Sequence, residues 1–357
     1  MKIKNLLTVL LSGLFVLSLS LWCFFGKTPD YSESERRVLE SFPKVTFDTI
    51  SSGEFSQDFE KYSTDRFPLR DTFRSLKAYT RLYAFSQKDN NGLFVAEGHL
   101  SKLQYPENPV MTQHATELFT KIKETYLADN KIYLTIIPDK NMFIARQNGY
   151  LSLDYKAFSE YFKTEMPYAE YIEISDFLNA DDYYLTDTHW RQEKITDVAK
   201  HLAESMGQTL NDTYTENTLR YPFNGVYVGQ SALKVKSDTI IYLTNDTIDS
   251  LEVEGAKAVY DMSKAQSKDP YEMFLSGTQP VVKVKNPQNA EGKRLVVFRD
   301  SFASSITPLL SKAYSEITLV DLRYINSSIL DQYVDFSNSD VLFMYSTMLL
   351  NDSLSMK

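Results

Sequence analysis

The stretch that decides the fold is Arg294-Leu295-Val296-Val297-Phe298-Arg299-Asp300-Ser301-Phe302-Ala303. Its first half, 294–298, is a short apolar run of the kind that forms a strand buried inside a sheet. A helical pattern of apolar residues follows at 305–314. Ligands of open α/β sheets bind at the carboxyl ends of the strands, so this order is expected to place Ser301 in a crevice there.

The same alternation of strand and helix extends over much of the chain. Further strands are expected at 131–138, 171–174, 317–320 and 341–345, and further helices at 116–123 and 191–206. Strands that alternate with helices predict an α/β fold with a mostly parallel sheet. Residues 210–290 differ, because short strand-like runs there are separated by loops rich in Asn, Asp and Thr. We interpret 210–290 as a β-rich insertion over the active face.

The N-terminus predicts a membrane anchor. Lys2 and Lys4 precede an apolar run at 6–25, and a helix of about 20 residues spans the roughly 30 Å of a bilayer core. The two lysines favour a cytoplasmic N-terminus, so the body beyond Gly26 is expected outside the cytoplasm. A cleaved signal peptide is the alternative, although its apolar core is usually shorter and ends in a small-residue cleavage motif.

The residues between the anchor and the body predict a tether and two helices. Residues 28–46 are polar and contain two prolines, and apolar side chains then recur at helical spacing in 55–62 and 73–83. We therefore divide the chain into a signal anchor at 1–27, a tether and helical N-terminal region at 28–100 and a catalytic domain at 101–357.

Composition excludes several classes of function. Apolar residues make up 43% of the chain and charged residues 24%, which predicts a folded core. The net charge is −9, and no basic patch suits a nucleic acid partner. The single cysteine, Cys23, lies in the apolar N-terminal run, so the body has no disulfide and no cysteine-rich metal site.

Asp187, His189 and Ser301 are the candidate catalytic residues. The first two lie in Thr186-Asp187-Thr188-His189-Trp190, and the chain has only 4 histidines. A serine hydroxyl needs a base to take its proton, and the base needs a carboxylate that fixes its tautomer and stabilises its charged form. These three residue types are therefore the parts of a nucleophilic triad.

Two other interpretations of these residues stay open. Asp300-Ser301 could simply cap a helix. Asp187 and His189 could be metal ligands, although zinc usually takes three or four protein ligands and the other histidines lack obvious companions. We expect no metal and no cofactor.

Several further side chains are candidates for contact with an oxyanion or a substrate. Backbone N–H groups of the turn at Ser301 and of the following helix N-terminus are natural oxyanion donors. Trp190 could present its flat face to a sugar ring or could pack at the start of a helix. The other candidates lie at or near expected strand ends and are Lys140, Asn141, Arg299, Asp300, Arg323 and Tyr345; for Lys140 and Asn141 a solvated loop is equally compatible with the sequence.

Three blocks of sequence resemble the DHHW family of bacterial proteins. The first is Ser32-Glu33-Ser34-Glu35-Arg36-Arg37-Val38-Leu39 with the following 53–70 stretch, and the third runs from Asp300-Ser301-Phe302-Ala303 to 320–324. The second is Asp187-Thr188-His189-Trp190, where the namesake motif has His in place of Thr188. The resemblance covers nearly all of 32–348, in family order.

This family is similar to the periplasmic alginate O-acetyltransferases, whose SGNH-hydrolase-like domain has a permuted order with Asp and His before Ser. The resemblance implies a three-layer α/β fold and acyl transfer through an acyl-serine. It also implies a partner, a membrane-bound O-acyltransferase that delivers acyl groups across the bilayer. Arg299 departs from the Gly that usually precedes the Asp-Ser pair, and could narrow the pocket or contact an acidic polymer.

The triad residues, the anchor and the family resemblance together predict a membrane-anchored, extracytoplasmic, SGNH-like O-acyltransferase that acts on a cell-surface or exported polysaccharide, with acetyl as the expected acyl group. A carbohydrate esterase, in which water accepts the acyl group, is one alternative. The other is a non-catalytic subunit that binds polymer or helps to assemble a polysaccharide acylation complex.

Overall fold

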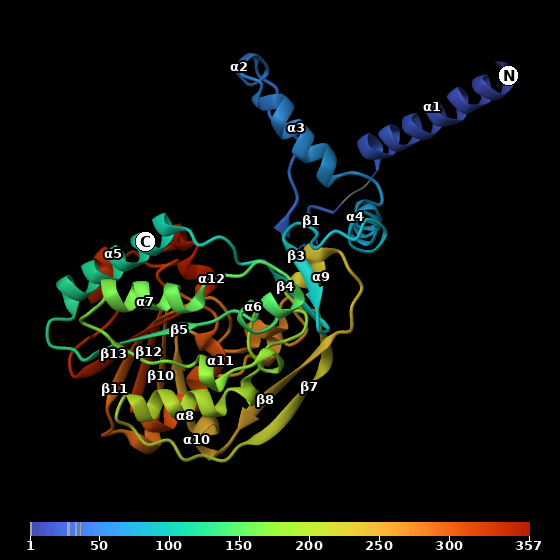
Figure 1. Ribbon diagram of the computed structural model, residues 1–357. Helices are drawn as coiled ribbons and strands as arrows, with labels where there is room; N and C mark the ends of the chain where they lie inside the picture. The colour runs from blue at the N-terminus through green and yellow to red at the C-terminus, as the bar shows by residue number, and fades with distance from the viewer. Residues whose placement is uncertain (1, 27–28, 33, 36) are drawn as a thin grey trace. The chain divides into compact units, whose positions relative to one another are not determined.

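The computed structural model describes residues 2–26, 29–32, 34–35 and 37–357 (Figure 1). Two compact units are present. The N-terminal unit comprises the chain up to Asn91 together with Val228–Lys234, and the larger unit comprises Gly92–Tyr227 and Val235–Lys357. Residues 1 and 27 of the expected anchor, residue 28 of the expected tether, and residues 33 and 36 of the first resemblance block lie outside the described residues.

The N-terminal unit begins with a long apolar helix, α1 (Lys2–Phe25). Its segment Ile3–Cys23 is long and apolar enough to cross a membrane. The elements that follow are a short hairpin of β1 (Tyr31–Ser32) and β2 (Arg37–Val38), and the helices α2 (Phe47–Ser51), α3 (Glu54–Asp65) and α4 (Arg70–Tyr79). A π-helical turn, Thr80–Ala84, continues α4.

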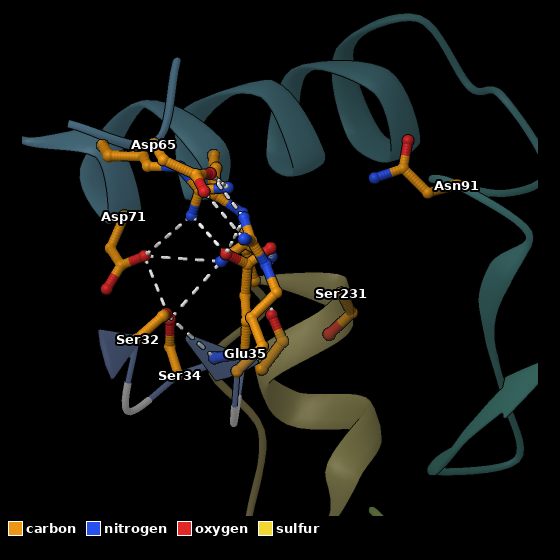
Figure 2. Close-up of polar contacts among 12 residues, drawn as sticks. Ser32, Ser34, Glu35, Asp65, Asp71, Asn91 and Ser231 are labelled. Carbon is orange, nitrogen blue, oxygen red and sulfur yellow. Dashed lines mark hydrogen bonds and ion pairs between the residues drawn. The ribbon is translucent and has the colours of Figure 1, made fainter. Parts of the chain in front are cut away.

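An ion-pair cluster connects the hairpin to α3 and α4 (Figure 2). Glu35 pairs with Arg37, Arg70 and Arg74, at N–O distances of 3.2, 2.5 and 3.3 Å. Asp65 pairs with Arg37 at 2.5 Å and with Arg70 at 3.4 Å. The described residues of α2, α3 and α4 include no buried apolar side chain larger than alanine. The hairpin is therefore joined to these helices by ion pairs, while partly exposed rings such as Phe42 and Phe59 add apolar contacts to α3.

The larger unit is built on a central sheet with the strand order β6-β5-β13-β11-β12-β10-β9. The strands β5 (Ile132–Ile137), β6 (Glu170–Tyr171), β11 (Arg294–Arg299), β12 (Glu316–Val320) and β13 (Ser339–Ser346) are parallel. β10 (Val281–Lys285) and β9 (Glu252–Glu254) continue the sheet antiparallel at the β12 edge. The predicted α/β fold with a mostly parallel sheet is confirmed.

Helices cover both faces of this sheet (Figure 1). α5 (Pro109–Tyr126) and α7 (Tyr155–Glu165) pack on one face, and α8 (Thr196–Ser205) and α11 (Ala303–Leu310) on the other. Within β11, Val296 and Phe298 belong to the apolar core beneath α5 and α7. Leu295 and Val297 belong to the apolar core beneath α8 and α11. Successive strand residues point to opposite faces, so an all-apolar strand such as 295–298 fits only between two helical layers.

Shorter elements complete the larger unit. Two hairpins are separate from the central sheet, β3 (Leu93–Ala96) with β4 (His99–Lys102), and β7 (Thr215–Phe223) with β8 (Asp238–Thr244). The short helices are α6 (Asn141–Ile144), α10 (Asp246–Ser250) and α12 (Thr347–Leu350), while α9 (Val226–Ser231) begins in the larger unit and ends in residues of the N-terminal unit.

The segment 210–290 differs in part from the insertion that the sequence suggested. The β7–β8 hairpin lies outside the central sheet, but β9 and β10 are strands of that sheet. In β10, Val282 and Val284 are buried and alternate with half-exposed lysines, which is the pattern of an antiparallel strand with one solvated face. The sheet therefore extends into what was expected to be a separate insertion.

Candidate active site

The structure brings Asp187, His189 and Ser301 together. Nδ1 of His189 lies 2.6 Å from Oδ1 of Asp187, and Nε2 lies 2.7 Å from Oγ of Ser301. The carboxylate accepts from Nδ1–H, so Nε2 is left to accept the serine hydroxyl hydrogen. Both ring nitrogens are engaged in this way, which leaves neither available to the metal that was the rival interpretation of Asp187 and His189.

Ser301 lies two residues beyond the carboxyl end of β11, where the sequence placed it. The turn is fixed by Asp300, whose Oδ1 accepts from the Phe302 amide at 3.1 Å. Its Oδ2 accepts from the Ser346 amide at 2.8 Å, at the end of the neighbouring strand β13. Asp300 therefore ties the serine turn to the sheet, and both carboxylate oxygens that we had considered for a ligand are used by the main chain.

Backbone amides donate hydrogen bonds to both carboxylate oxygens of Asp187. Its Oδ2 accepts from the Val226 amide at 2.8 Å, and its Oδ1 accepts from the His189 amide at 3.1 Å. The close approach depends on Gly225, because a Cβ there would lie 2.4 Å from both the Thr186 carbonyl oxygen and Asp187 Cβ. Only glycine lets the start of α9 reach the carboxylate.

The surroundings of Asp187 favour its charged form. Burial by itself raises the pKa of this carboxyl, but the adjacent His189 and the hydrogen bonds from the His189 ring and the two backbone amides lower it further than burial raises it. The net pKa of Asp187 is well below its usual range. An ionised carboxylate at this position stabilises the positive charge that the imidazole acquires when it takes a proton.

Lys140 is not at the rim of a crevice, as the sequence had suggested. Its side chain is buried, and Nζ donates to the carbonyl oxygens of Tyr184 at 2.9 Å, Leu185 at 3.2 Å and Asp187 at 2.9 Å. Burial lowers the pKa of Lys140 to about 7. The three bonds use all three ammonium hydrogens, so Lys140 supports the segment that carries Asp187.

Asn141 is buried next to Lys140 and is likewise occupied by protein. Its Nδ2 donates to the Lys102 carbonyl at 2.5 Å, and its Oδ1 accepts from Ser101 Oγ at 2.7 Å. Its side chain fastens β4 beside α6 and offers no group to a substrate.

Three more candidates are buried beneath the site instead of lining it. Trp190 is fully buried, and its Nε1–H donates to the Phe302 carbonyl at 3.1 Å and to Ser305 Oγ at 2.9 Å, so its ring presents no face to a sugar. Tyr345 is buried and stacks on a ring of α5. Arg299 is 1% exposed, donates to Ser304 Oγ at 3.2 Å and lies under α11, so it neither narrows the pocket nor reaches a polymer.

A cleft of about 550 Å³ opens in front of Ser301. Its lining comprises Thr188, Asp300, Ser301, Phe302, Arg323, Tyr324, Ser346, Met348, Leu349, Asp352 and Ser355. Of the expected rim residues, Arg323 does line it, with its guanidinium held by Asp321 through bonds of 2.9 and 2.6 Å. The neighbouring Tyr324 is 54% exposed and provides an aromatic surface that sequence reasoning had not singled out.

The backbone amides of the serine turn are mostly occupied. Those of Phe302 and Ala303 donate to Asp300, and that of Ser304 donates to the Ser301 carbonyl. Within the described part of the chain, the Ser301 amide makes no hydrogen bond to protein. The expected oxyanion donors of the helix N-terminus are thus reduced to the Ser301 amide.

Tyr271 is a component of the site that the sequence did not reveal. Its ring stacks on the His189 ring at a centroid distance of 3.9 Å and an interplanar angle of 13°, and its hydroxyl lies 2.9 Å from Ser305 Oγ. Phe302 lies on the imidazole as well, at 4.9 Å. Together the two rings confine the imidazole. Tyr271 lies in a short 3-10 helix, Pro270–Met273, far from either motif in the sequence, and no local pattern distinguishes it from the chain's other tyrosines.

Solved structures of other proteins are similar to this fold and help to interpret it. A DHHW family protein shares this fold. That protein, from Eubacterium siraeum, matches with a TM-score of 0.56 and 20% identity over 73% of this chain and 93% of its own. The family resemblance of the three sequence blocks therefore agrees with the fold.

Bacillus cereus PatB1 is similar as well. It matches with a TM-score of 0.57 and 16% identity over 73% of this chain and 97% of its own. A second structure of PatB1, with a sulfonyl adduct, matches with a TM-score of 0.55 and 18% identity over 72% and 95%. No protein-family model matches the chain, and neither does any curated protein.

Proposed function

We propose that the protein is an extracytoplasmic O-acyltransferase, anchored in the membrane by α1, that transfers an acetyl group to a cell-surface or exported polysaccharide. The observation that carries this proposal is the hydrogen-bonded series from Asp187 through His189 to Ser301, with 2.6 and 2.7 Å between the partner atoms, at the edge of a cleft of about 550 Å³. This is the arrangement that activates a serine for acyl transfer.

The first half-reaction acylates the serine. Oγ of Ser301 attacks the carbonyl carbon of the acyl donor while Nε2 of His189 takes the hydroxyl proton, and Asp187 stabilises the imidazolium. The Ser301 amide donates to the oxyanion of the tetrahedral intermediate. When the bond between the carbonyl carbon and the leaving group breaks, the leaving group takes the proton from Nε2, and an acyl ester remains on Ser301.

The second half-reaction transfers the acyl group to a sugar. A hydroxyl of the acceptor attacks the acyl-serine carbonyl and gives its proton to Nε2 of His189. The bond from the carbonyl carbon to Oγ then breaks, and Ser301 recovers the proton. In this proposal Arg323 and the exposed ring of Tyr324 contact the saccharide, because both line the cleft next to Ser301.

The proposed location of the site beyond the membrane determines which kind of partner must supply the acyl group. Acyl donors of metabolism are made in the cytoplasm, while the proposed site lies beyond the membrane. A membrane-bound O-acyltransferase that passes acyl groups across the bilayer is therefore the proposed partner, in line with the family resemblance. The apolar segment Ile3–Cys23 keeps the protein in the same membrane.

The test is covalent labelling of the full-length protein in detergent. Incubation with p-nitrophenyl acetate, and separately with a sulfonyl fluoride, is followed by intact-mass measurement and peptide mapping. We expect one adduct per chain, on Ser301, which Ser301→Ala and His189→Ala abolish. Ser355→Ala is the matched control, because Ser355 is an exposed serine of the same cleft, and it should label normally.

The result also separates the transferase from its alternatives. A folded protein without any adduct would contradict the catalytic proposal and favour the non-catalytic polymer-binding or assembly subunit. An acyl-serine that water releases as fast in the absence as in the presence of oligosaccharide acceptors would identify an esterase.

A further inference from the structure

Helix α4 turns its charged side toward the protein interior and its apolar side toward solvent. Arg70, Arg74 and the buried Ala78 face the interior of the N-terminal unit. The opposite side of the helix and its π-helical continuation carries Leu69, Phe73, Leu76, Tyr79 and Tyr83, which are all exposed and which we call the outer stripe. An amphipathic helix of a globular protein normally buries its apolar side and exposes its charges, and α4 does the reverse.

The inverted orientation is fixed by specific contacts. Nη1 of Arg70 lies 2.5 Å from Glu35, and Nη2 of Arg74 lies 3.3 Å from Glu35 and donates to the Gly229 carbonyl at 2.8 Å. Ser75 Oγ adds a bond to the Ala232 carbonyl at 2.7 Å. Figure 2 shows this cluster on the inner side of the helix. Rotation of α4 to bury the outer stripe would break all of these bonds.

The outer stripe is a large apolar surface left to solvent. Leu76 is 60% exposed and Tyr83 65%, and the rings of Tyr79 and Tyr83 stack on each other at 5.6 Å. Soluble proteins rarely expose contiguous apolar surface of this kind unless it contacts another molecule or a membrane.

The connection between α1 and the hairpin indicates whether another molecule or a membrane covers the outer stripe. α1 ends at Phe25 and β1 begins at Tyr31, and six residue steps reach at most about 22 Å. The hairpin that begins at Tyr31 carries Glu35, to which α4 is bound. The outer stripe is thus kept within a short distance of the point at which α1 leaves the bilayer.

We propose that the outer stripe of α4 lies in the interfacial layer of the same bilayer that α1 spans. Leu69, Phe73 and Leu76 would enter the boundary between headgroups and acyl chains, a position typical of amphipathic helices with a charged face. Lys77, exposed beside the stripe, is placed to meet lipid phosphates. This inference rests on the proposed membrane anchoring, and it adds a second membrane contact to that anchor.

The experiment places a fluorophore at single sites of the full-length chain. Cys23 is the chain's single cysteine, so Cys23→Ser provides the background for Leu76→Cys. Leu17→Cys in α1 marks the anchor. Leu151→Cys is the matched control, because Leu151 is an exposed leucine of the larger unit with 61% exposure, nearly equal to that of Leu76.

Each variant is labelled with nitrobenzoxadiazole and reconstituted in vesicles of phosphatidylcholine and phosphatidylglycerol, with and without nitroxide-labelled lipid. We expect labels at positions 17 and 76 to shift their emission to the blue and to lose most of it to the nitroxide lipid. The label at position 151 should keep both its wavelength and its intensity, and it should be quenched by aqueous iodide.

The other outcomes overturn the inference in distinguishable ways. If the label at position 17 is quenched by lipid but the label at position 76 is not, the anchor stands and the outer stripe is not in the bilayer. If position 76 is shielded from both quenchers and becomes accessible when the protein is diluted in lipid, a second copy of the chain covers it. If neither position 17 nor position 76 is quenched by lipid, the anchoring fails together with the inference.

Discussion

Nε2 of His189 lies 2.7 Å from Oγ of Ser301, although 112 residues separate the two along the chain. Each of the two residues is fixed by contacts of its own. His189 is held by Asp187 and stacked on Tyr271, while Ser301 follows the turn that Asp300 ties to β13. If the site binds an acyl donor as proposed, it requires little reorganisation on binding.

Replacing Asp187 with Asn should leave the fold intact and reduce turnover of p-nitrophenyl acetate by up to ~10⁴, because the amide favours the wrong imidazole tautomer. The measurement is steady-state kinetics on protein whose circular dichroism matches that of the parent. Asp58→Asn, at an exposed pair with Lys61, is the control and should turn over normally. Full activity in Asp187→Asn would remove this carboxylate from the mechanism.

Asp187 should also contribute to stability in a pH-dependent way. Its folded pKa is lowered, so the unfolded state binds its proton at higher pH, and the contribution is fully present above the unfolded pKa of about 3.9. It is lost as the pH falls through the folded pKa. Denaturant titrations of parent and Asp187→Asn should therefore converge on acidification below about pH 4. A constant gap at all pH values would contradict a charged Asp187.

Lys140→Met should weaken both stability and turnover. The substitution leaves the carbonyls of Tyr184, Leu185 and Asp187 without their shared donor, and an unsatisfied buried group costs about 1–3 kcal/mol. A shift of the Asp187 segment by 1 Å would lower kcat by up to about 10²-fold. Thermal unfolding and kinetics test this, with the exposed Lys156→Met as the matched control. Unchanged kcat in a folded Lys140→Met protein would show that the segment holds its position alone.

Tyr271 should act through its ring. Tyr271→Phe keeps the stack on His189 and loses only the bond to Ser305, so we expect turnover close to that of the parent. Tyr271→Leu removes an aromatic contact worth about 0.5–1.5 kcal/mol, and kcat should fall about two- to tenfold. The two variants are compared by kcat and by the pH profile of kcat/KM. Equal losses in both would assign the effect to the hydroxyl instead.

Gly225→Ala should damage the site from the backbone. The new Cβ meets the Thr186 carbonyl and Asp187 Cβ at 2.4 Å, and such overpacking costs about 1–3 kcal/mol. The Val226 amide would move away from Asp187, so turnover should fall with stability. Gly207→Ala is the control: its φ of +74° strains an alanine, but open space surrounds the new Cβ, so only stability should fall. Normal kcat in Gly225→Ala would show that the amide contact is dispensable.

The sequence was sufficient for the parts of the fold that apolar patterns determine. The run at 295–298 has no polar face, so it had to lie between two layers, and Ser301 then had to stand at a strand end. The pairing of Asp187 with His189 was also predictable, since two residues in so short a motif share one neighbourhood.

Burial of polar side chains was not predictable in the same way. Lys140 follows the end of β5, where a side chain can face a crevice or be covered by another loop, and only the fold shows that 184–187 lies over it. Trp190 and Tyr345 do not contact the cleft for the same reason, because other parts of the fold cover both side chains. In α4 the helical spacing was predictable but the exposed side was not, because its apolar stripe has the spacing of a core-facing helix and yet faces solvent.

The strand order has a consequence for how the protein matures. β13, the last strand in the sequence, lies between β5 and β11 in the middle of the sheet. In the proposed topology the body crosses the membrane from its anchored end onward, so β5 and β11 emerge before their common neighbour. The sheet cannot close, and the Asp300 bond to Ser346 cannot form, until residue 346 has emerged. If the body is exported as proposed, the partly translocated chain presents two unpaired strand edges, and at this stage it is prone to pair with another chain.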